Sequence, residues 1–173
     1  MAQILLVGDS LVADHDWQPR MVGYQVINCG IPGLVTTDLL TSLPAIKKKV
    51  EHADVILVMI GTNDLLSGNY DIIDTIKEII VQIHKLYPTA ELVFNSLLPI
   101  EYPGLPDQMV NSLNVQIEAL TVQTGSCFLN THSRFLDSDK ELFQADGVHL
   151  TETAYEIWSR SLLEYIAFLV EDD

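Results

Sequence analysis

The chain has 173 residues, 48% hydrophobic and 19% charged, which is typical of one globular domain, so we expect a single domain over residues 1–173. A net charge of −15 would repel nucleic-acid phosphates and anionic lipid surfaces and argues against both kinds of partner. Two cysteines, Cys29 and Cys127, are too few for a disulfide scaffold, and we expect both to be reduced.

The N-terminal segment predicts a strand, not a targeting signal. Residues 3–7 are mostly apolar and run into Gly8 with no basic stretch ahead of them. The longest strongly apolar run, residues 55–60, falls far short of the roughly 20 residues of a membrane helix. We therefore expect a cytoplasmic protein without stable membrane insertion, unless a leader has been removed from the chain.

Short apolar runs rich in β-branched residues alternate with longer stretches of helical spacing. Three of the short runs are apolar nearly throughout, as in strands buried on both faces of a parallel sheet. The expected strands are residues 3–7, 24–28, 55–60, 91–97 and 127–130. The alternation predicts an α/β protein with three layers, α/β/α, around a flavodoxin-like, five-stranded parallel sheet.

Four longer stretches are expected to be helical. Residues 36–49 form the first, which Pro44 should interrupt, and residues 72–86 form the second, which has a wide apolar stripe and ends before Pro88. A third stripe covers residues 110–120, and a fourth covers residues 155–169, with Thr151 as a cap.

Polar or glycine-rich turns follow the strands, at the sheet edge where ligands bind in such folds. The turns are residues 8–11, 28–33, 61–64 and 146–149. Ser10 in the first turn could simply cap a helix, but His149 supplies a base for a nucleophilic serine, and Asp146 could orient that base. Gly33 and Asn63 could donate hydrogen bonds to an oxyanion, although each alone is adequately explained as a turn residue.

Together these turns resemble the four blocks of the SGNH, or GDSL-type, hydrolases in their proper order. The blocks are Gly8-Asp9-Ser10-Leu11, Asn28-x-Gly30-x-x-Gly33, Gly61-x-Asn63-Asp64 and Asp146-x-x-His149. The resemblance spans the whole chain, from Gly8 to the final expected helix. The stretches 58–63, 97–99 and 146–151 look most like the branch of platelet-activating-factor acetylhydrolase-like and lysophospholipase-like esterases.

The resemblance implies a serine esterase that hydrolyses small-molecule acyl esters through an acyl-enzyme and needs no cofactor. It implies that Ser10, His149 and Asp146 form the catalytic triad, and that Ser10, Gly33 and Asn63 form the oxyanion hole. Residues 13–17 depart from the family pattern because they are bulky and charged, and we expect residues 14–16 to form a solvent-facing loop at the pocket rim. The sequence makes no prediction of the oligomeric state.

Two other functions compete with this one. A metal-dependent phosphoesterase could use the Asp and His residues of the same turns, but it would leave Ser10 without a role. A non-catalytic, flavodoxin-like module could hold an anion at helix N-termini, but the chain has no phosphate-binding glycine loop.

Three further predictions concern side chains around the site. Tyr102 and Leu105, in the loop 99–108, are proposed to line the acyl or leaving-group site, with a simple connector as the alternative. Asp9 and Asp64 are expected to accept hydrogen bonds from turn N–H groups. His132, after the fifth strand, is the remaining histidine that could line the site.

Overall fold

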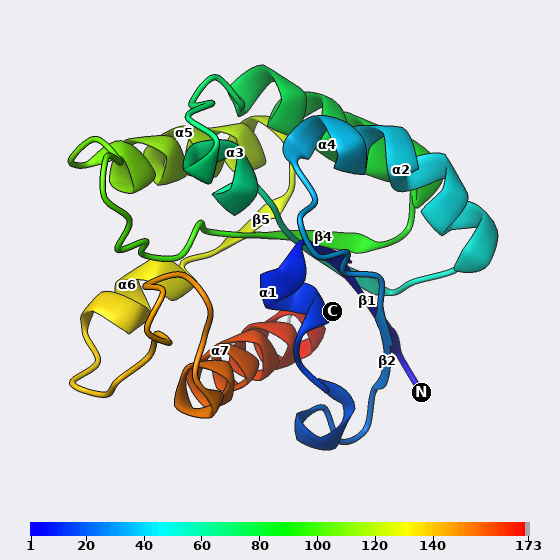
Figure 1. Ribbon diagram of the computed structural model, residues 1–173. Helices are drawn as coiled ribbons and strands as arrows, with labels where there is room; N and C mark the ends of the chain where they lie inside the picture. Colours follow the sequence, from blue (N-terminus) through cyan, green and yellow to red (C-terminus); the bar gives the residue numbers. More distant parts are fainter. Residues whose placement is uncertain (172–173) are drawn as a thin grey trace.

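The computed structural model describes residues 1–171 and contains one five-stranded sheet in which every strand is parallel to its neighbours (Figure 1). The strand order is β2-β1-β3-β4-β5. The strands are β1 Gln3–Gly8, β2 Gln25–Asn28, β3 Val55–Met59, β4 Glu91–Asn95 and β5 Cys127–Leu129. All five expected strands are thus found, with ends that differ by at most two residues.

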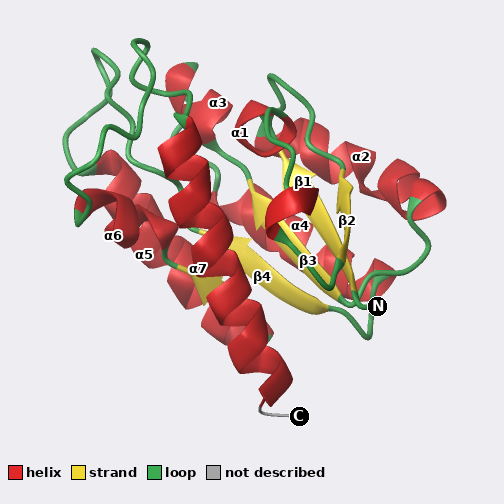
Figure 2. Cartoon of the chain, turned by 90° about the horizontal axis from the view of Figure 1, so that it is seen from below, coloured by secondary structure: helices red, strands yellow, loops and turns green. Residues whose placement is uncertain are grey.

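Helices cover both faces of the sheet, as Figures 1 and 2 show, which confirms the predicted three-layer α/β fold. One face packs against α2 Thr36–Lys49, α4 Ile73–Leu86 and α5 Met109–Thr124. The other face packs against α1 Ser10–Ala13, α6 Thr131–Leu136 and α7 Glu152–Glu171. The short helix α3 Thr62–Leu66 follows β3, and a 3-10 turn covers Gln18–Arg20. None of the helices within residues 1–171 is long and apolar enough to span a membrane.

The expected interruption of α2 at Pro44 is wrong, because the helix runs through this residue. Pro44 is exposed, whereas Leu39, Leu43 and Ile46 on the opposite side are buried in the core against α4 and the sheet. Burial of that apolar side offsets the one backbone hydrogen bond that a proline removes. The predicted cap of α7 is confirmed, since Thr151 Oγ1 accepts a bond of 3.3 Å from Ala154 N–H.

The carboxyl ends of β1 and β3 lie in very close contact. In the parallel register Gly8 pairs with Met59, and a Cβ atom on Gly8 would lie 2.3 Å from the Met59 carbonyl oxygen. Only glycine therefore fits at this position. The close contact brings the turn after β1, which holds Ser10, beside the turn after β3, which holds Asn63.

Candidate active site

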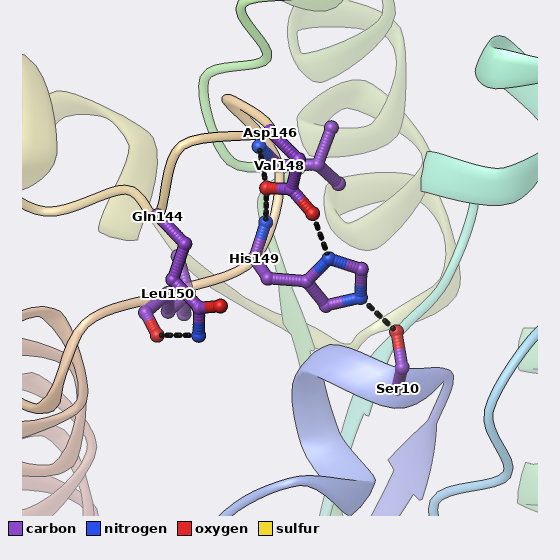
Figure 3. Close-up of polar contacts among 6 residues, drawn as sticks. All are labelled: Ser10, Gln144, Asp146, Val148, His149 and Leu150. Atoms are coloured by element: carbon purple, nitrogen blue, oxygen red, sulfur yellow. Dashed lines mark hydrogen bonds and ion pairs between the residues drawn. The ribbon is translucent and has the colours of Figure 1, made fainter.

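Ser10 is the first residue of α1 and stands at the carboxyl end of β1, which lies between β2 and β3 in the sheet. Asp9 caps this helix, since its Oδ1 accepts a 3.0 Å bond from Leu11 N–H. Ser10 Oγ lies 3.3 Å from His149 Nε2, although the two residues are 139 positions apart (Figure 3). The fold thus brings the predicted serine and histidine within reach of a hydrogen bond.

Asp146 shapes the turn that holds His149. Its Oδ1 accepts bonds from Val148 N–H at 3.0 Å and from His149 N–H at 2.9 Å, and its Oδ2 lies 2.5 Å from His149 Nδ1 (Figure 3). With the ring proton on Nδ1, the ring donates to Asp146 and leaves Nε2 free to accept the Ser10 proton. The bond from the His149 side chain, followed by the two backbone bonds, lowers the pKa of Asp146 to about 2.

A network of hydrogen bonds joins the turns that carry Gly33 and Asn63. The Asn63 amide nitrogen donates to the Leu34 carbonyl at 3.0 Å. The Asp64 carboxylate accepts from Thr36 N–H at 3.0 Å and from the Thr36 hydroxyl at 2.8 Å. Gly33 has φ +80°, a left-handed conformation that side chains disfavour. Asn63 is therefore held next to Leu34, the residue that follows Gly33.

The loop after β2, which includes Gly30 and Ile31, also contacts the end of β1 and helix α1. Ile31 N–H donates to the Gly8 carbonyl at 2.9 Å, and Gly30 lies so near Ala13 that a Cβ on Gly30 would be 2.5 Å from its nitrogen. Within residues 1–171, neither the Ser10 N–H nor the Gly33 N–H donates to a protein acceptor. These two N–H groups and the second amide proton of Asn63 are three donors available to an oxygen atom at this edge of the sheet.

Asp9 and Asp64 accept bonds from backbone N–H groups, as predicted, but nothing in the sequence indicated how deeply they are buried. Their exposed fractions are 0% and 2%. Burial raises the pKa of Asp9 to about 7, and it also raises the pKa of Asp64. Asp9 Oδ2 is buried and has no hydrogen-bond partner among residues 1–171.

The expectation that residues 14–16 form a solvent-facing loop is only partly right. Asp14 and Asp16 are exposed, but the half-buried His15 ring stacks on Tyr155 of α7 with ring centroids 4.2 Å apart. Trp17 is fully packed beneath them, at 1% exposure. Aromatic packing against α7 therefore holds this segment against the protein, a tertiary contact that its local charge pattern gave no sign of.

Asp14 does lie at the rim of the site. It lines a cavity of about 280 Å³ together with His149, Glu152 and Tyr155. The cavity beside His149 thus carries two carboxylates, those of Asp14 and Glu152. The spacing of the apolar residues predicted only that Tyr155 lies on a helix, and nothing in the sequence linked it to the site.

Tyr102 and Leu105 share a different cavity of about 410 Å³, which His132 also lines. Ser10, Asp146 and His149 are not among its lining residues. The loop still contacts the site, because Glu101 N–H donates to the Gly147 carbonyl at 3.0 Å, directly beside Asp146. The assignment of Tyr102 and Leu105 to substrate binding stays a prediction.

Within residues 1–171, no three His, Cys, Asp or Glu side chains gather as a metal site requires. Both cysteines are free thiols in the part of the chain that the structure describes.

The chain is similar to known proteins along nearly its whole length. Residues 6–157 match the model of the GDSL-like Lipase/Acylhydrolase family. Platelet-activating factor acetylhydrolase IB subunit alpha1 of Rattus norvegicus is 27% identical over 169 residues, which cover 94% of this chain and 70% of the relative.

Solved structures share the fold at lower identity. Est24, a carbohydrate acetylesterase from Sinorhizobium meliloti, has a TM-score of 0.81 and 19% identity, covering 98% of this chain and all of its own. The lipase/acylhydrolase from Enterococcus faecalis has a TM-score of 0.79 and 22% identity, covering 96% of this chain and 95% of its own.

Proposed function

Because the chain belongs to the GDSL-like lipase/acylhydrolase family, and is thus an enzyme of the carboxylic ester hydrolase type, we propose that it is a serine esterase that acts through an acyl-enzyme on Ser10. The observation that carries this proposal is the continuous chain of contacts from Ser10 Oγ to His149 Nε2 at 3.3 Å and from His149 Nδ1 to Asp146 Oδ2 at 2.5 Å. A nucleophile, a base and an orienting carboxylate in this order are what acyl transfer to serine requires.

In the first half of the reaction, Ser10 Oγ attacks the ester carbonyl carbon while His149 Nε2 takes the hydroxyl proton. The carbonyl oxygen becomes an oxyanion, which accepts hydrogen bonds from Ser10 N–H, Gly33 N–H and the Asn63 amide. The tetrahedral intermediate then collapses, the ester C–O bond breaks, and the alcohol leaves with the proton from His149. Asp146 keeps the ring oriented and stabilises its charged form.

In the second half, water attacks the acyl carbon and gives a proton to His149 Nε2. The second tetrahedral intermediate then collapses, the bond between the acyl carbon and Ser10 Oγ breaks, and the carboxylic acid leaves as His149 Nε2 returns its proton to Ser10 Oγ. His149 is partly open to solvent, with 41% of its side chain exposed, so water reaches the base without any large movement.

The substrate is a small-molecule acyl ester. The platelet-activating factor relative is named an acetylhydrolase, which makes an acetyl ester the first substrate to test. A series of p-nitrophenyl esters from acetate to palmitate then measures the preferred acyl chain length through kcat/KM.

A fluorophosphonate probe tests the nucleophile, because the probe labels only an activated serine. We expect labelling of the native enzyme and none of Ser10→Ala. The chain offers a matched control in Ser126, whose Oγ lies 2.8 Å from His84 Nε2; among the described residues no carboxylate bonds to that ring. Ser126→Ala should label as the native enzyme does, and labelling that persists in Ser10→Ala would refute the proposal.

The comparisons do not favour the metal-dependent phosphoesterase or the binding module. A chelator separates the first of these from the esterase. We expect esterase activity to be unchanged by EDTA, whereas loss with EDTA and recovery with a divalent cation would support the phosphoesterase.

A further inference from the structure

Asp9 is a buried carboxyl group next to the nucleophile, and the mechanism proposed above gives it no step. Its side chain is 0% exposed. One oxygen, Oδ1, is occupied by Leu11 N–H at 3.0 Å, whereas Oδ2 is buried and has no protein partner among the described residues. An ionised carboxylate in such a place leaves charge unsolvated, so a structural role as a helix cap alone does not require an aspartate; Asn or Ser would cap equally well.

Asp9 directly precedes Ser10, whose Oγ lies 3.3 Å from His149 Nε2, so the buried carboxyl group is close to the proposed base. The charged and titratable groups that interact with Asp9 come from three elements. His149, in the turn before α7, attracts the negative charge of Asp9, and Asp64 on α3 repels it. Tyr155 on α7 also faces Asp9, whose charge contributes to raising the pKa of the Tyr155 hydroxyl. The one cationic partner of Asp9 among these groups is thus the imidazolium form of the proposed base.

We propose that Asp9 is a positioning residue that acts through His149: Oδ1 fixes the turn that carries Ser10, and the negative charge on Oδ2 stabilises the imidazolium that forms each time His149 takes a proton. This inference rests on the proposed function, because it assigns a second carboxylate, besides Asp146, to the same base. Asp146 is half exposed to solvent, whereas the buried Asp9 acts through a medium of low polarity and is screened less.

In this arrangement the protonation of Asp9 and the protonation of His149 affect each other. Burial raises the pKa of Asp9 to about 7, so this carboxyl group gains and loses its charge near neutral pH. Ionisation of Asp9 favours protonated His149, and protonated His149 favours ionised Asp9.

The first test is the pH profile of kcat/KM for p-nitrophenyl acetate in the native enzyme and in Asp9→Asn. The variant keeps an acceptor for Leu11 N–H but removes the charge. We expect its rising limb at lower pH than that of the native enzyme, by on the order of half a pH unit, because imidazolium has lost an attractive neighbour. A uniform loss of kcat/KM at every pH, with the limb in place, would mean a purely structural role and would overturn the proposal.

Asp54→Asn is the matched control for net charge. Asp54 accepts a 2.7 Å bond from Gln3 N–H at the opposite, amino end of the sheet, so the same substitution there removes one charge far from the site. Its pH profile should coincide with that of the native enzyme. An equal shift in both variants would reflect overall charge and would refute a specific role for Asp9.

A second measurement covers the case in which Asp9→Asn does not fold. In Ser10→Ala protein with ¹³C-labelled aspartate, the Asp9 carboxyl carbon should titrate near neutral pH and move together with the His149 ring signals. Asp9 and His149 signals that move independently of each other would overturn the proposal. This readout needs no turnover, so it remains decisive even if the esterase assignment fails.

Discussion

At the residue scale, Asn63 is the clearest test of the electrophilic part of the site. Its amide nitrogen donates one proton to the Leu34 carbonyl at 3.0 Å, and this bond fixes the direction of the second amide proton. Because the substrate oxygen carries a full charge only in the tetrahedral intermediate, loss of the amide should affect kcat more than KM. We expect Asn63→Ala to lower kcat by roughly 10²–10³-fold.

Asn63→Asp is the matched variant, because it keeps the shape of the side chain but offers no donor and repels an oxyanion. It should be no more active than Asn63→Ala. Thermal unfolding of both variants checks that the turn survives without the bond to Leu34. If Asn63→Ala kept nearly full kcat while Ser10→Ala lost all turnover, the enzyme would remain a serine esterase but Asn63 would not belong to its oxyanion hole.

The burial of Asp9 should also make the free energy of unfolding depend on pH. Its pKa rises from 3.8 to about 7 on folding, so between these values the folded protein binds a proton that the unfolded chain has lost. The contribution of Asp9 is therefore most favourable below pH 4 and is lost as pH rises to about 7. From pH 5 to pH 8 the native protein should lose about 2–3 kcal/mol of unfolding free energy relative to Asp9→Asn, measured by urea denaturation. A difference that does not change with pH would contradict the raised pKa.

At the element scale, the loop 99–108 carries the remaining prediction about the substrate. Tyr102 and Leu105 line a cavity of about 410 Å³ that does not include the triad, while the neighbouring Glu101 contacts the Asp146 turn. If this cavity holds the acyl chain or the alcohol, Tyr102→Ala and Leu105→Ala should change how kcat/KM varies with chain length over the p-nitrophenyl series. Val122→Ala, at an exposed position of α5, should leave the profile unchanged. An unaltered profile in all three variants would identify the loop as a connector.

Helix α2 makes a separate prediction about stability. Pro44 is exposed in the interior of Thr36–Lys49, where a proline lacks the N–H that would bond to the previous turn. Replacement by alanine restores this bond but frees the unfolded chain, so we expect Pro44→Ala to raise the unfolding free energy by about 1–2 kcal/mol. Pro88→Ala, beyond the end of α4, restores no helical bond and should be neutral or slightly destabilising. Destabilisation by Pro44→Ala would show that the proline shapes the helix.

How far the sequence predicts each element depends on whether the signal is local. β1, β3, β4 and α4 were predictable because their residues are buried on repeated faces, so the sequence pattern reflects the packing. Trp17 and His15 were not, because what decides their position is the aromatic surface of α7, far away in the chain. Asp9 shows the same limit at the site: its type and turn position were readable, but its complete burial depends on the contact of several elements.

At the scale of the whole molecule, the net charge of −15 should select among ester substrates. Two carboxylates, Asp14 and Glu152, line the opening beside His149, so the local charge has the same sign as the overall charge. A negative field lowers the local concentration of anionic substrates and raises that of cationic ones, and salt screens it over about 10 Å at 0.1 M.

We therefore expect kcat/KM for an anionic acyl ester to rise severalfold when ionic strength increases from about 0.01 to about 0.3 M, because the Debye length falls from about 30 Å to about 6 Å. A cationic ester of the same acyl group should lose a similar factor. A neutral ester is the control, and its kcat/KM should change little. Asp14→Asn, which removes one of the two carboxylates, should reduce both salt effects without changing their signs. Equal responses of the three substrates to salt would show that the acidic surface plays no part in bringing the substrate to Ser10.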